Sequence, residues 1–291
     1  MAPAHSAPER SFVNGRYGQM HLRRADPATG GATPVVCLHM FPQSGRNFEA
    51  LLPLLGRHRT AIAPDFPGYG ESTPPPQPIA AADYAAAIWD VVDALDLCGE
   101  HGQVHLFGIH AGAKLATEVA RQRPDAVGRI ILSSAAVLTE AELDALKQAF
   151  TPIPLDHAGT RFARLWDLLN RNRGTGVTLE MQAISFAEML RGGEAYEWGH
   201  DAVFEYNRVF PAAIAELAHE ITLLNPGDDL YAMTPRTLAH IRNGELHDRP
   251  EWQHGFLEVH AQAVAALIED RLTAPPRTAN PIPEEAQCLP T

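Results

Sequence analysis

The chain has 291 residues, of which 45% are hydrophobic, and this is enough to bury one large core without requiring a second domain. Its formal net charge of −12 and the lack of any run of Lys or Arg exclude a nucleic acid as partner, because phosphate contacts need a basic face. No stretch approaches the roughly 18 apolar residues of a membrane span, and residues 1–10 lack a signal-peptide pattern, so we expect a soluble, cytoplasmic protein without a membrane partner. Three cysteines are too few and too scattered for a disulfide framework or a thiolate metal site.

Over the first 133 residues, short apolar or β-branched runs alternate with segments of helical periodicity. In chain order, we predict two short strands within 12–24, a strand at 33–38, a helix at 48–55, a strand at 59–63, a helix at 81–97, a strand at 103–107, a helix at 113–123 and a strand at 128–133. This alternation indicates an α/β fold with a mainly parallel sheet that is covered by helices on both faces.

The pattern then changes, because residues 139–218 are helical and rich in aromatic residues and contain no convincing strand. Strands resume at 220–224 and again near 242–246, and a final helix is expected at 259–272. We therefore predict four parts: a first core part 12–138, an inserted helical cap 139–218, a second core part 219–272, and a Pro-rich, disordered tail 273–291.

Several short motifs follow one another in an order typical of one superfamily. They are residues 37–42 (CLHMFP), 65–72 (DFPGYGES), 108–112 (GIHAG), 225–229 (NPGDD) and 253–255 (QHG). Each motif alone is weak, but in this order and at these spacings they resemble the α/β-hydrolase superfamily with a helical cap, over residues 12–272.

The most unusual feature of this resemblance is His110, which stands where the family carries its nucleophilic serine. Gly108 and Gly112 flank it as in the family's nucleophile elbow, a tight turn from strand to helix in which larger flanking side chains would collide with neighbouring elements. The resemblance implies that His254 is the general base and that Asp229 is the acid that orients it, with Asp228, one residue out of register, as the alternative acid.

The resemblance also implies an oxyanion hole made by two backbone N–H groups, those of Phe41 and Ala111. Met40 replaces the usual glycine of that loop. By the same resemblance His39 is the histidine that supports the loop, whereas the alternation within the predicted strand 103–107 makes His105 a core residue.

Three roles are open for His110. Its imidazole can attack a carbonyl as an atypical nucleophile, because the resulting acyl-imidazole would hydrolyse readily. Alternatively, His110 and His254 act as bases on a bound water, since two neighbouring imidazoles disfavour each other's protonation. A metal ion held by His39, His110, His254 and Asp229 is the third option, which we do not favour because no closely spaced ligand pair anchors it. We expect no metal and no cofactor.

The function that follows is hydrolysis of an ester, lactone or activated C–C bond in a small, apolar or aromatic molecule. A cofactor-free lyase or oxygenase that uses His254 as base is one alternative, and a non-catalytic ligand-binding protein of the same fold is another. The expected partner is a small-molecule substrate, and the chain is expected to be a monomer or homodimer. The substrate itself is not fixed by the sequence.

Overall fold

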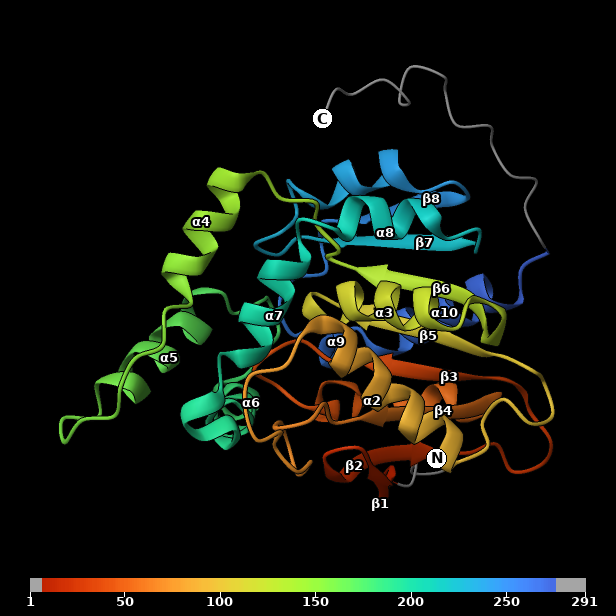
Figure 1. Ribbon diagram of the computed structural model, residues 1–291, viewed down its shortest axis with the longest axis horizontal. Coiled ribbons are helices and arrows are strands. Elements are labelled where there is room, and N and C mark those ends of the chain that lie inside the picture. The colour runs from red at the N-terminus through yellow and green to blue at the C-terminus, as the bar shows by residue number, and fades with distance from the viewer. Residues whose placement is uncertain (1–6, 276–291) are drawn as a thin grey trace.

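The computed structural model describes residues 7–275, and its centre is a twisted eight-stranded sheet with the strand order β1-β2-β4-β3-β5-β6-β7-β8 (Figure 1). The strands pair in parallel from β4 through β3 to β8, while β1 and β2 form an antiparallel hairpin that joins β4 at one edge. The strands are β1 (Glu9–Gly15), β2 (Gly18–Ala25), β3 (Ala32–Leu38), β4 (Arg59–Pro64), β5 (Val104–Ile109), β6 (Val127–Ser133), β7 (Ile221–Pro226) and β8 (Gly244–Arg249). The predicted α/β fold with a mainly parallel sheet is confirmed.

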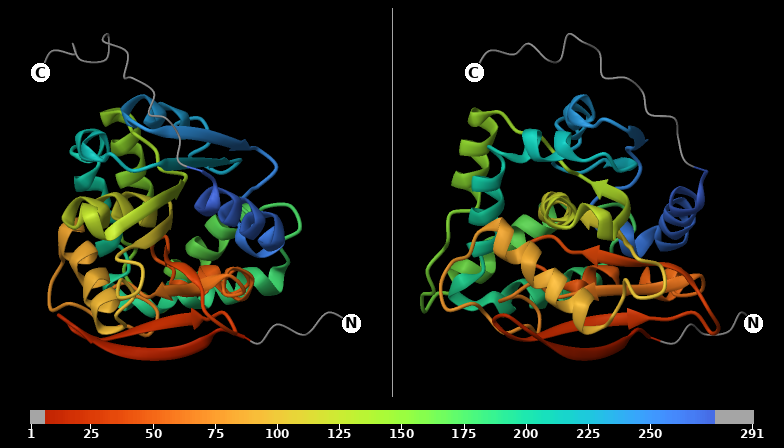
Figure 2. Two further views of the ribbon diagram at one scale, coloured as in Figure 1. Left: turned by 90° about the vertical axis from the view of Figure 1, so that its right-hand side faces the viewer. Right: turned by 45° about the vertical axis from the view of Figure 1, so that its right-hand side comes forward.

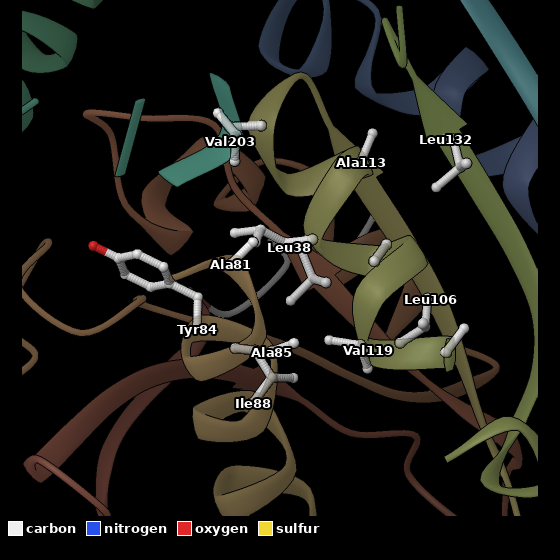
Figure 3. Close-up of a cluster of buried hydrophobic side chains, with 14 of the residues drawn as sticks. Leu38, Ala81, Tyr84, Ala85, Ile88, Leu106, Ala113, Val119, Leu132 and Val203 are labelled. Carbon is white, nitrogen blue, oxygen red and sulfur yellow. The ribbon is translucent and has the colours of Figure 1, made fainter. Parts of the chain in front are cut away.

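Helices cover both faces of the sheet, as the continuous burial of the central strands β3, β5 and β7 requires. In β3, Val36 and Leu38 belong to one apolar cluster, with α2 (Ala81–Ala94) and α3 (Ala111–Gln122), whereas Val35 and Cys37 belong to a second one on the other face. The second cluster includes residues of α1 (Leu52–Leu55), α9 (Phe256–Val259) and α10 (Ala261–Thr273). Figure 3 shows part of the first cluster, with Leu38, Ile88, Leu106 and Val119 from sheet and helices gathered together.

Among the described residues, the segment between β6 and β7 holds helices and no strand. These helices are α4 (Glu140–Ala149), α5 (Thr160–Arg171), α6 (Leu179–Met189), α7 (Trp198–Tyr206) and α8 (Phe210–Glu216). Figures 1 and 2 place α4, α5 and α6 beyond the carboxyl ends of the parallel strands, where they cover that edge of the sheet. Helix α8 instead packs beside α3, and its Phe210 and Ile214 belong to the main core. The predicted boundaries of the cap and the core parts stay predictions.

One predicted helix is shorter than expected. The segment 48–55 forms a 3-10 turn, η1 (Gly45–Phe48), and the short α1 instead of one helix, whereas the predicted final helix 259–272 is found as α10, with the short α9 before it. The other 3-10 helices are η2 (Pro124–Ala126), η3 (Leu190–Ala195) and η4 (Thr234–His240). Helix α10 ends at Thr273, so the predicted tail 273–291 lies outside the described residues from residue 276 onward. No helix within residues 7–275 has the length and apolar character needed to cross a bilayer.

Candidate active site

His110 occupies a tight turn between the end of β5 and the start of α3. Its backbone has φ 49° and ψ −117°, a region that few L-residues adopt. A Cβ on Gly108 would lie 2.3 Å from the carbonyl oxygen of Gly112, and a Cβ on Gly112 would lie 2.1 Å from the carbonyl oxygen of Leu38. Both glycines are therefore required by close backbone approaches, which is the steric reason inferred from the sequence.

The side chain of His110 is bound to a buried carboxylate. Its Nε2 lies 3.0 Å from Oδ2 of Asp228, whose side chain is only 2% exposed. Ser134, which follows β6, donates its hydroxyl to the same Oδ2, and the backbone N–H of Leu230 donates to Oδ1 at 2.9 Å. Asp228 thus has donors on both oxygens and is held firmly against His110.

This ion pair decides the charge of His110. Burial of the imidazole lowers its pKa, but the negative charge and hydrogen bond of Asp228, helped by Asp229, outweigh burial and raise the pKa of His110 to about 9. Conversely, burial raises the pKa of Asp228, while His110 and the Ser134 hydroxyl lower it, and the net pKa lies below its usual value. At neutral pH the pair is therefore an imidazolium and a carboxylate.

His254 has a different acid as its partner. Its Nε2 lies 3.0 Å from Oδ1 of Asp229. Burial raises the pKa of Asp229, but the bond to His254 and the charge of His110 lower it to about 2, so this carboxylate stays ionised. A proton held on Nε2 by the carboxylate leaves Nδ1 of a neutral His254 with its lone pair. The pairing of His254 with Asp229 is the one that the sequence predicted.

The two pairs lie side by side. The rings of His110 and His254 are stacked with centroids 5.5 Å apart and an interplanar angle of 25°. A ring nitrogen of His110, a ring nitrogen of His254 and a carboxylate oxygen of Asp229 all lie within 4.8 Å of one another. These three residues therefore form a group that could hold a metal ion. His39 is not part of this group, because its Nδ1 bonds to the carbonyl of Met40 and its Nε2 accepts the N–H of Phe66. The expected absence of a metal stays a prediction.

The residues of the predicted oxyanion hole line the same cavity as His110. Ala111 is the first residue of α3, so its N–H has no acceptor within the helix. Phe41 lies in a turn that the hydrogen bond from the N–H of Gln43 to the carbonyl of Met40 closes at 3.1 Å. The convergence of the two N–H groups on a substrate oxygen stays a prediction. His105 lies apart in β5, where its Nδ1 accepts the N–H of Arg129, as suits a core histidine.

A cavity of about 240 Å³ separates the two histidine–aspartate pairs from the helical insert. The insert contributes apolar side chains to its walls: Leu146, Phe150, Leu168, Leu169, Val177, Met181, Ile184, Met189, Val203 and Phe204. A cavity of this size and lining suits a small, largely apolar molecule.

The cavity wall also has polar residues that were not singled out in the sequence, among them Ser134, His200 and Lys114. Ser134 bonds to Asp228, His200 is held by Glu197 through its Nδ1, and Lys114 donates from Nζ to Oδ1 of Asn207 at 2.8 Å. The position of Lys114 contained a weak signal, because it is a charged residue that closely follows His110 in the sequence. Ser134 and His200 belong to no recognisable motif.

Comparisons with known proteins agree with the fold. A family model described as alpha/beta hydrolase fold matches residues 33–170. The chain is 27% identical over 242 residues to the 2-hydroxymuconate semialdehyde hydrolase of Pseudomonas sp. strain CF600. This alignment covers 78% of this chain and 81% of that protein. It is 28% identical over 194 residues to the dihydrolipoyllysine-residue acetyltransferase component of the acetoin cleaving system of Pseudomonas putida. This second alignment covers 62% of this chain and only 50% of that protein.

Among solved structures, the enol-lactonase from Burkholderia xenovorans LB400 superposes with a TM-score of 0.70 at 18% identity, covering 90% of this chain and 100% of that chain. At this level of identity the likeness concerns the fold. The chain therefore has the α/β-hydrolase fold, and its residues 33–170 match the family model of that description.

Proposed function

We propose that this chain hydrolyses an ester, a lactone or an activated carbon–carbon bond next to a carbonyl, in a small and largely apolar molecule. The observation that carries the proposal is the pair of histidine–aspartate contacts that line an apolar cavity together with Ala111, the first residue of α3. The proteins that this chain resembles include a 2-hydroxymuconate semialdehyde hydrolase and an enol-lactonase, and their names describe hydrolysis of this kind.

We assign the role of general base to His254. Asp229 holds the proton of the neutral ring on Nε2 and stabilises the imidazolium that forms when Nδ1 accepts a second proton. In the proposed reaction, His254 removes a proton from a water molecule while the water oxygen attacks the carbonyl carbon. The carbonyl electron pair moves onto its oxygen, and when the tetrahedral intermediate collapses, the leaving group takes the proton from His254.

We assign His110 an electrostatic role in place of a nucleophilic one. A nucleophile or base needs a free lone pair, but the pKa of His110, raised to about 9 beside Asp228, keeps a proton on both ring nitrogens at neutral pH. A fixed positive charge beside the reacting carbonyl stabilises the negative oxygen that develops there, together with the N–H groups of Ala111 and Phe41. His110 would thus replace the covalent step of a serine with stabilisation of direct water attack.

The pH dependence separates these two roles of His110. If His110 acts as a cation, kcat/KM for 4-nitrophenyl valerate falls as pH rises through about 9, where the imidazolium loses its proton. If His110 were the nucleophile, kcat/KM would rise over the same range, because deprotonation would create the attacking lone pair. A rise of kcat/KM through this range would therefore refute our assignment.

Variants and isotope labelling test the reaction itself. We expect His254→Ala to lose activity on aryl esters and on a lactone panel by roughly 10²- to 10⁴-fold, which is the usual contribution of a general base. His58→Ala is the matched control, because His58 is exposed and does not line the cavity. Hydrolysis in H₂¹⁸O should place one ¹⁸O atom in each acid product, and mass spectrometry should find no acyl group on the protein.

Two results would contradict the hydrolase. Full activity of His254→Ala would remove the proposed base, and conversion of the substrate without entry of ¹⁸O would indicate a lyase.

A further inference from the structure

We propose that Lys114 receives a carboxylate of the substrate, so that the hydrolysed molecule is a short half-ester or oxo acid with its negative charge a few bonds from the reacting carbonyl. This inference rests on the proposed hydrolytic function and names the substrate class for the same cavity. Lys114 projects from α3, the helix that begins beside His110, and it is one of the residues that line the cavity.

The first argument is that Lys114 has no counter-charge. Within residues 7–275, every other buried Arg or Asp, and every buried Glu except Glu197, has an oppositely charged partner within 4.0 Å. These pairs are Arg23 with Asp65, Arg59 with Glu269, Glu118 with Arg121, Arg161 with Glu194 and Glu188 with Arg191, while Glu197 contacts the imidazole of His200. Lys114 is only 7% exposed and contacts a neutral amide instead.

The second argument is that its surroundings do not replace the missing charge. An ammonium group has three N–H donors, and the only acceptor found for them in the described part of the chain is Oδ1 of Asn207. The ring of Phe210, with its centroid 5.4 Å away, adds a weak cation–π contact. Lys114 also lies in the first turns of α3, where the helix dipole disfavours a positive charge.

The third argument is energetic. Burial without a compensating charge lowers the pKa of Lys114 to about 7, so the protein holds an ammonium group that is only marginally stable. Replacing such a lysine by an apolar residue of similar length would be more favourable for folding alone. A bound carboxylate would supply the missing partner, and strongly perturbed groups in a cavity are typical of functional sites.

The position of Lys114 limits the length of the substrate. Lys114 belongs to the first turns of the helix that begins directly after His110, so the two side chains start from neighbouring parts of the chain. If the reacting carbonyl lies beside His110 and the N–H of Ala111, a carboxylate that reaches Lys114 is separated from it by a short chain. Half-esters of four- and five-carbon dicarboxylic acids have this geometry.

Binding measurements test the carboxylate site without relying on turnover. We would titrate 4-phenylbutyrate and its neutral analogue 4-phenylbutyramide into the wild-type chain, into Lys114→Met and into Lys147→Met by calorimetry. Lys147 is the matched control, because it is half-exposed, pairs with Glu205 and does not line the cavity. Wild type and Lys147→Met should bind the carboxylate more tightly than the amide, and Lys114→Met should lose roughly 10- to 100-fold in affinity for the carboxylate only.

A kinetic comparison links the site to the reaction. The ratio of kcat/KM for 4-nitrophenyl hydrogen glutarate to that for 4-nitrophenyl valerate should fall by about the same factor in Lys114→Met, mainly through KM. Equal binding of carboxylate and amide by the wild type, or unchanged carboxylate affinity of Lys114→Met, would overturn the carboxylate site. If binding behaves as expected but neither ester is hydrolysed, the hydrolase proposal fails while the carboxylate site stands.

Discussion

Replacing Asp228 by Asn should convert His110 from a cation to a neutral imidazole at neutral pH. The substitution keeps the shape of the side chain and still offers an oxygen to the Ser134 hydroxyl, but it removes the negative charge beside Nε2 of His110. Burial, which is the largest influence on this imidazole and favours its neutral form, is then opposed only by the more distant charge of Asp229. We therefore expect the pKa of His110 to fall from about 9 to below its ordinary value of 6.5.

The same change has a consequence for stability. The difference between 6.5 in the unfolded chain and about 9 in the folded one corresponds to roughly 3 kcal/mol. Because the folded pKa is the higher one, this stabilisation is fully present below pH 6.5 and is lost as pH rises through 9. The His110 side chain is 18% exposed, so solvent screening reduces the expected value to about 2 kcal/mol.

Two measurements check this prediction. NMR of ¹⁵N-labelled imidazole should follow the titration of His110 directly, in the wild type and in Asp228→Asn. Urea unfolding at about pH 6 and about pH 9.5 should show the loss of stability in the wild type, and Asp228→Asn should lack the His110 contribution. Asp248→Asn is the matched control, because Asp248 bonds to Asn225 and Tyr231 and makes no contact with His110.

The reasoning is refuted if His110 of the wild type titrates below pH 7, or if its pKa is the same in Asp228→Asn. Either result would mean that the short contact between His110 and Asp228 does not fix the charge of the ring. The electrostatic role proposed for His110 would then have no basis.

Three other substitutions give independent checks. Asp229→Asn should lower kcat by about 10²-fold or more while leaving the fold intact, because His254 loses the carboxylate that orients it; an unchanged kcat would exclude this acid. Gly112→Ala should destabilise the chain by on the order of 3 kcal/mol in denaturant unfolding, since its Cβ would lie 2.1 Å from the carbonyl oxygen of Leu38, and a neutral effect would contradict the close approach. Lys114→Met should be more stable than wild type by on the order of 2 kcal/mol below pH 7, and the difference should shrink as pH rises from about 7 to 10.5, where only the native state has lost the proton. An equal stability at all pH values would show that Lys114 is not buried as a charge.

The elbow could be predicted from the sequence because its reason is local. Gly108 and Gly112 are needed wherever a strand turns into a helix this tightly, whatever residue stands between them. The sheet was predictable for a similar reason, since strands that are buried on both faces are short continuous apolar runs between helices. Each of these patterns depends on residues that are close together in the chain.

The pairing of Asp228 with His110 could not be predicted, because it depends on contacts between distant segments. Asp228 and Asp229 are neighbours after β7, and the sequence offers no reason for both to be used. The structure separates them: Asp228 lies under the end of β6, where Ser134 holds it against His110, and Asp229 faces the loop of His254. From the sequence, Asp228 and Asp229 are alternatives for one acid. In the structure each of the two carboxylates contacts its own histidine.

The two pairings together explain why a histidine at the elbow is compatible with chemistry. In a site with one carboxylate, a second histidine would compete with His254 for that charge and lower its ability to accept a proton. Here Asp228 is occupied by His110, so Asp229 remains available to His254. In the proposed reaction, the cation at the elbow stabilises the negative oxygen while the independent base His254 activates water, so that no covalent intermediate is required.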